Sequence, residues 1–153
     1  MTMKQEPQEL LLKDICARLP YGIKASYYGV EEECETWDEI EGITLDEDFG
    51  GYVDIGQYSL PIERIKPYLF PLSSMTDEQW KELRNLIYEY FALDEEFNEG
   101  ICYKTYGDIL VWLDEKPINE CYFIFDYLNK NHFDYRGLIP MGLAIDATGL
   151  NIY

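Results

Sequence analysis

The stretch TDEQWKELRNLIYEYFA, residues 76–92, contains the clearest helix pattern in the chain. Thr76 and Gln79 have the spacing of a capping box, in which each side chain accepts a hydrogen bond from the backbone of the other. Apolar residues then recur every three or four positions, at Trp80, Leu83, Ile87, Tyr90 and Phe91. This periodicity predicts an amphipathic helix whose apolar stripe is buried.

Residues 22–70, which precede this helix, have the composition of strands. GIKASYYGV, residues 22–30, alternates between apolar and polar positions and is bounded by glycines. Further along, prolines at 61, 67 and 71 exclude a helix. We therefore predict a sheet built largely from residues 22–60, with the helix at 76–92 packed on it.

Two further helices are predicted, at residues 8–18 and at about 119–131, from apolar spacing and flanking proline, glycine and asparagine. Residues 94–117 fit either a helix or strands, and the last segment reads as a loop with a short strand. The prediction is an α+β fold: a single domain over residues 1–153, with an antiparallel sheet in the N-terminal half packed with two or three helices.

Composition and charge exclude several classes of protein. Aromatic residues make up 16% of the 153 residues, which is too many for a disordered chain. The formal net charge is −18, from 30 acidic and 12 basic residues. Nucleic acids and anionic membranes bind clustered lysine and arginine, so we predict neither nucleic-acid nor membrane binding.

The acidic residues concentrate in residues 31–54, which hold 11 Asp and Glu and neither Lys nor Arg. The same window contains Trp37, Ile40 and Val53, so it predicts strands or turns with one packed face and one acidic face. We expect it to bind a basic protein partner. The candidate residues are Glu31, Glu33, Glu35, Asp38, Glu39, Glu41, Asp46, Glu47, Asp48, Tyr52 and Asp54.

A nucleic-acid mimic is the sharpest form of this hypothesis. If residues 31–35 are extended, the carboxylates of Glu31, Glu33 and Glu35 share one face at a spacing of about 6.6–6.8 Å. Successive phosphates of one DNA strand lie about 3.4 Å apart along the axis and further apart along the backbone. Such a row could occupy the phosphate-binding side chains of a partner, for example a defence protein. The alternative is that the charge only maintains solubility.

Catalytic and metal-binding patterns are weak in this chain. Residues 46–57 resemble a calcium loop, but Gln57 stands where a bidentate glutamate is needed. His132 is the only histidine, and with Asp134 it could serve a metal; alternatively Asp134 pairs with Arg136 or caps a turn, with His132 hydrogen-bonded. We predict a non-enzyme without metal, cofactor or catalytic residues. A carboxylate- and metal-dependent hydrolase or nuclease, and a structural or regulatory homo-oligomer, remain as alternatives.

The four cysteines form no CxxC pair, and the N-terminus lacks the apolar run of a signal peptide. These patterns predict free thiols and a cytoplasmic protein.

Three stretches carry a resemblance to a known family: DICARLPYG (14–22), KPYLFPLSSMT (66–76) and DYLNKNHFDYRGLIPMGLAIDATGLNIY (126–153). They resemble a family of small uncharacterised proteins from gut Bacteroidales and from their phages and mobile elements. The acidic window lies outside these stretches. The resemblance implies a phage or mobile-element setting and implies no activity.

Overall fold

The computed structural model describes residues 7–28, 36–46, 50–91 and 122–153, apart from the side chains of 46, 50, 87, 88, 90 and 91. Its helices are α1 (Pro7–Arg18), α2 (Asp77–Phe91) and α5 (Tyr122–Lys130). Its strands are β1 (Lys24–Tyr27), β2 (Thr36–Asp46), β3 (Gly50–Ile55), β4 (Tyr58–Pro61), β5 (Ile65–Pro71), β6 (Phe133–Asp134) and β7 (Ile145–Asp146). These elements confirm the predicted α+β fold, with the sheet mainly in the N-terminal half.

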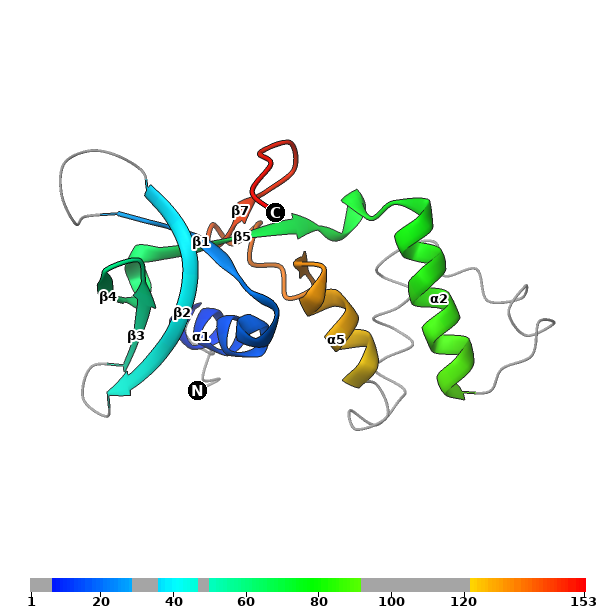
Figure 1. Cartoon of the computed structure of the whole chain (residues 1–153), viewed down its shortest axis with the longest axis horizontal. Helices are drawn as coiled ribbons and strands as arrows, with labels where there is room; N and C mark the ends of the chain where they lie inside the picture. Colours follow the sequence, from blue (N-terminus) through cyan, green and yellow to red (C-terminus); the bar gives the residue numbers. More distant parts are fainter. Residues whose placement is uncertain (1–6, 29–35, 47–49, 92–121) are drawn as a thin grey trace, which may run out of the picture.

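The strands form one sheet in the order β4-β3-β2-β1-β5-β6, and β7 also pairs with β5 (Figure 1). Strands β1 to β5 pair antiparallel, whereas β6 and β7 run parallel to β5. The long strand β2 is shared between two partners. Residues 36–39 pair with β1 and residues 40–46 with β3, and the pairing with β3 is interrupted by a bulge between Ile40 and Gly42.

Helix α1 covers one face of this sheet. Leu11 and Ile15 pack with buried strand residues, among them Ile40 and Ile55, and this cluster is the main core. The helix continues into a 3₁₀ turn, Leu19–Tyr21, and Gly22 follows with a φ of 75°, a left-handed conformation that glycine adopts without strain. The predicted helix at residues 8–18 is confirmed.

The predicted helix at 76–92 is confirmed together with its capping box. The Thr76 hydroxyl accepts from the Gln79 nitrogen at 3.1 Å, and the Gln79 side-chain oxygen accepts from the Thr76 nitrogen at 3.0 Å. Leu83 is fully buried, and Trp80 packs against the same cluster. The side chains of Ile87 and Phe91 lie outside the described residues.

The predicted packing partner of this helix is wrong. Helix α2 contacts α5 and lies beside it at one end of the molecule, whereas α1 lies against the sheet (Figure 1). Because α1 and residues such as Leu138 already fill the core face of the sheet, the apolar stripe of α2 packs against Ile124 and Leu128 of α5. The Tyr127 hydroxyl joins the two helices by donating to the Gln79 carbonyl at 3.0 Å.

A buried charge cluster ties α1 to the C-terminal segment. Asp14 and Arg18, both fully buried, form a two-point ion pair with N···O distances of 2.8 and 3.1 Å. Arg18 also donates to the Phe133 carbonyl at 2.7 Å, and Arg136 donates to Asp14 at 3.1 Å. Residues more than a hundred positions apart are therefore held together by charged hydrogen bonds.

Some predictions fall outside the described residues, among them residues 94–117 and the beginning of the helix at 119–131, of which the structure describes Tyr122 onward. In the parts that are described, none of the helices has the length and apolar character needed to cross a bilayer.

Candidate functional site

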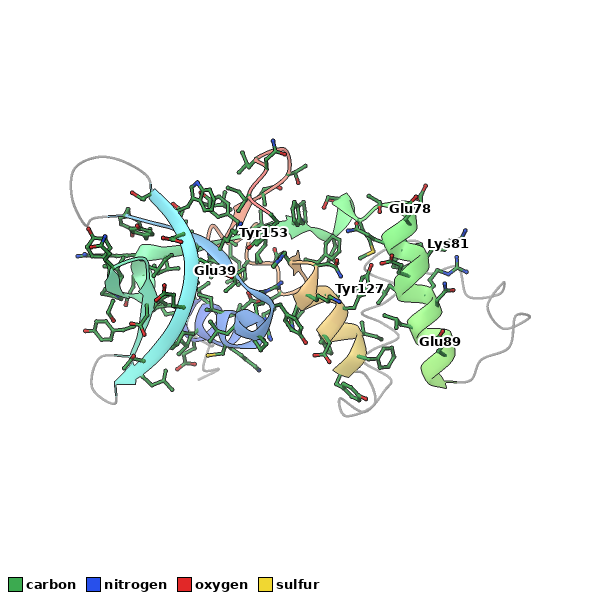
Figure 2. The ribbon with its side chains drawn as sticks, in the orientation of Figure 1. Glu39, Glu78, Lys81, Glu89, Tyr127 and Tyr153 are labelled. Atoms are coloured by element: carbon green, nitrogen blue, oxygen red, sulfur yellow. The ribbon has the colours of Figure 1, made fainter. Side chains whose placement is uncertain are left out.

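The face of the sheet opposite α1 carries the candidate site. Side chains alternate along a strand, and Ile40, Val53 and Ile55 are buried on the side of α1. Their neighbours Glu39, Tyr52 and Asp54 therefore lie on the other face. Glu39 is seen on β2 in Figure 2.

Trp37 lies on this same outer face, two residues before Glu39, and 46% of its surface is exposed. On the neighbouring strand pair, Gly42 lies opposite Asp54, and a Cβ atom at Gly42 would approach the Asp54 carboxylate to 3.4 Å. We call Trp37, Glu39, Tyr52 and Asp54 the β2 surface. It combines an exposed aromatic ring with two carboxylates.

Lys24 is the cross-strand neighbour of Glu39, but its ammonium group binds elsewhere. The Nζ atom donates to the Ile152 carbonyl at 2.7 Å. It also lies 5.4 Å from the ring centre of Trp37 and 5.5 Å from that of Tyr153, both within cation–π range. The lysine charge is thus held between two aromatic rings and a carbonyl.

The hydroxyl group of Tyr153 makes backbone hydrogen bonds beside this surface. It accepts from the backbone nitrogen of Lys24 at 3.0 Å and donates to the Tyr68 carbonyl at 2.9 Å. Although 41% of the residue is exposed, enclosure of this hydroxyl raises its pKa to about 12. The hydrogen bond from the Lys24 backbone and the charge of Arg18 oppose this rise in pKa, and the carboxylate of Glu39 contributes to it.

The His132 ring stacks on Tyr153, with ring centres 3.6 Å apart and planes within 11°. Burial, together with the charges of Arg18 and Lys24, lowers its pKa to about 4. Within the described residues, its Nδ1 atom has no hydrogen-bond partner. The expected hydrogen bonding of His132 is found at its backbone nitrogen, which donates to the Asn129 carbonyl at 3.1 Å, and not at Nδ1.

Asp134 caps a turn, as one of the two predicted alternatives has it. Its carboxylate accepts from the backbone nitrogens of Leu138 and Ile139, both at 2.9 Å. The alternative pairing with Arg136 is not formed, since Arg136 binds Asp14. His132 and Asp134 therefore have separate structural partners.

The predicted partner-binding residues divide into groups. Glu39, Tyr52 and Asp54 share the outer face, and Glu41 is exposed in the bulge of β2. Asp38 lies on the opposite face, paired with the buried Ala25. Its carboxylate contributes, after burial, to a raised pKa of Tyr27. The predicted residues that lie outside the description are Glu31, Glu33, Glu35, Glu47, Asp48 and the side chain of Asp46.

Sequence analysis missed Lys24 and Tyr153 and used Trp37 only as a packing residue. Two-residue spacing from Glu39 could have placed Trp37 on the acidic face, because strand residues alternate. The contact between Lys24 and Tyr153 joins residues 129 positions apart, and local patterns carry no signal for it.

The calcium-loop hypothesis for residues 46–57 conflicts with the strand pairing. Residues 50–55 form β3, in which Gly51 pairs with Leu45 and Asp54 with Ser59. An extended strand does not wrap around an ion as a calcium loop does. Over the described ranges, no three His, Cys, Asp or Glu side chains are grouped to hold a metal.

Comparison with known proteins gives no relative from which a function could be taken: the chain matches no protein-family model, no curated protein and no solved structure.

Proposed function

We propose that this chain is a non-catalytic binding protein that contacts a basic protein partner through the β2 surface. The observation that carries the proposal is the 46% exposure of Trp37 on the outer face of the sheet, two residues before Glu39 and on the same face as Asp54. A half-exposed tryptophan ring offers a partner a large apolar contact area with a polar N–H at its edge. Tryptophan is also the residue type most enriched among those that dominate binding energy at protein interfaces.

Charge supports a basic partner. The whole chain carries −18, so its field attracts cations over the distance of about one Debye length. At the β2 surface the nearest lysine, Lys24, is bound to the Ile152 carbonyl and to two rings. The Lys24 ammonium is therefore held beside Trp37, and the carboxylates of Glu39 and Asp54 can bind basic side chains of a partner.

The chemistry of His132 supports a function without catalysis. General bases work best with a pKa near the working pH. The pKa of His132 is lowered to about 4, and the ring is stacked on Tyr153. This histidine, the only one in the chain, is therefore neutral and enclosed at neutral pH.

The finer form of the proposal is mimicry of a nucleic acid. Glu31, Glu33 and Glu35 directly precede β2 in the sequence and would add their charge to the binding surface, and the partner would be a nucleic-acid-binding protein, such as a host defence protein. Changing these three glutamates to lysine should abolish partner capture with no loss of folding. Double-stranded DNA added in excess should also displace the partner, whereas continued capture in its presence would argue against mimicry.

Affinity capture with matched variants tests the general proposal. Wild-type protein, Trp37→Ala and Tyr122→Ala would be immobilised and exposed to a bacterial lysate at low salt. Tyr122 is a suitable control because it is an aromatic residue of similar exposure, 56%, on α5. We expect wild type and Tyr122→Ala to retain the same basic proteins, and Trp37→Ala to lose them. Equal retention by all three would refute the β2 surface as the contact.

A further inference from the structure

We infer that residues 147–153 form a latch that sets the β2 surface for binding, by holding Lys24 beneath Trp37. This inference rests on the proposed function and adds a means of regulating it. In the latched state Trp37 is supported from below and the Lys24 charge is kept away from Glu39.

The first observation is a side-chain hydroxyl in the place of a strand hydrogen bond. Strands β1 and β5 pair through Ala25 and Pro67, and the next residues in this register are Lys24 and Tyr68. The Tyr153 hydroxyl lies between the backbones of these two, 3.0 Å from the Lys24 nitrogen and 2.9 Å from the Tyr68 oxygen. The tail therefore inserts where the two strands separate.

The second observation is that the tail is fixed at both of its ends. At its beginning, the Ala147 nitrogen donates to the Leu69 carbonyl at 2.8 Å. At its end, Ile152 is buried in a cluster with Ala147 and Tyr68, and the Tyr153 ring lies against His132 and Phe70. The segment is thus docked against β5 and against His132.

The third observation links the tail to the binding surface. Three groups of Lys24 are bound by the tail: its backbone nitrogen and carbonyl by the Tyr153 hydroxyl, and its ammonium by the Ile152 carbonyl. The same ammonium lies 5.4 Å from the centre of the Trp37 ring. If the tail leaves, Lys24 loses these hydrogen bonds, and its ammonium is no longer held beside the Trp37 ring.

Release of the tail also changes the charge of the surface. Glu39 is the cross-strand neighbour of Lys24, and opposite charges at such positions attract. A freed Lys24 ammonium would pair with Glu39 and neutralise one of the two carboxylates of the β2 surface. The latched state is therefore the state that binds a basic partner.

The indole N–H resonance of Trp37 reports on this link without any partner. We would compare wild type with Lys24→Met and Tyr153→Leu, assigning the resonance by its loss in Trp37→Phe. Tyr28→Phe is the matched control, because Tyr28 directly follows β1 and its hydroxyl also donates to a backbone carbonyl, that of Glu63 at 3.0 Å. We expect Lys24→Met and Tyr153→Leu to shift the Trp37 resonance. Tyr28→Phe should leave its position unchanged.

Partner capture then separates the two proposals. With the basic protein captured by wild type, Tyr153→Leu should bind about two- to fivefold more weakly, the factor that corresponds to one exposed cation–π contact. Lys24→Met, which leaves no lysine to neutralise Glu39, should bind no more weakly than Tyr153→Leu. An unmoved Trp37 resonance in both variants would overturn the latch, whatever the binding result. A shifted resonance with unchanged binding would refute the regulatory role. Binding that survives Trp37→Ala would refute the proposed function but leave the resonance result standing.

Discussion

The hydroxyl of Tyr153 accepts a hydrogen bond from the backbone nitrogen of Lys24, 129 positions earlier in the chain. In a regular sheet that nitrogen would donate to a neighbouring strand, and here a side chain takes the role of the strand. The end of the described chain is therefore built into the sheet at the point where β1 and β5 separate, directly beside the exposed Trp37.

Tyr153→Phe removes this hydroxyl and keeps the ring. We expect a loss of about 1 kcal/mol in the free energy of unfolding, since Lys24 and Tyr68 each lose a hydrogen-bond partner. Urea denaturation measures it. Tyr28→Phe is the control and should change stability by less than about 0.5 kcal/mol, because water replaces an exposed hydrogen bond. Equal losses in both variants would contradict the special role of Tyr153.

Alkaline pH should destabilise the protein through the same tyrosine. Burial raises the pKa of Tyr153 to about 12, from the ordinary value of 10. The folded state then holds this proton more tightly than the unfolded state, so the free energy of unfolding falls as the pH rises from 10 to 12. Tyr127, also with a raised pKa, adds to the fall. Tyr153→Phe should flatten the pH dependence in urea denaturation, and an unchanged slope would contradict the assignment.

His132 should destabilise the protein at acid pH. Its pKa is lowered to about 4 from 6.5, so the unfolded state takes up the proton first as the pH falls. Stability should therefore decrease from pH 6.5 to 4. Because the chain has one histidine, the imidazole C–H resonance needs no assignment, and its titration midpoint should lie near pH 4. A midpoint near 6.5 would show that the ring is not enclosed by Tyr153.

Asp14→Asn tests the buried charge cluster. The substitution leaves the guanidinium of Arg18 buried without its carboxylate, and breaking such a pair costs about 3–5 kcal/mol. Glu63→Gln, which changes an exposed acid, is the control and should cost less than about 0.5 kcal/mol. Thermal or urea unfolding measures both variants. A loss for Asp14→Asn as small as that of the control would contradict a desolvated ion pair.

Local patterns in the sequence predicted the elements of the fold better than their packing. The capping box of Thr76 and Gln79 formed as expected, because its partners are three residues apart. The packing of α2 was predicted wrongly, since the sequence does not show that α1 fills the core face of the sheet. The acidic window was a correct guide to the outer face only at alternate residues, because a strand sends Asp38 and Glu39 to opposite sides.

The candidate site depends on contacts between distant parts of the chain. Lys24, Trp37 and Tyr153 come from the first strand, the second strand and the end of the sequence. None of the three is unusual in its local context, so no motif marks them. Their grouping follows from the splaying of β1 and β5, which is a property of the folded sheet.

A charge-matched capture experiment tests the central claim, that the β2 surface binds a basic partner. Two double variants are compared. The β2 pair is Glu39→Lys with Asp54→Lys, and the α2 pair is Glu78→Lys with Glu89→Lys, at exposed positions of α2 (Figure 2). Each pair changes the net charge from −18 to −14. The account predicts that the β2 pair loses the basic partner while the α2 pair retains it, at salt concentrations where wild type binds. Equal loss by both pairs would show a non-specific effect of net charge, and retention by the β2 pair would contradict the account.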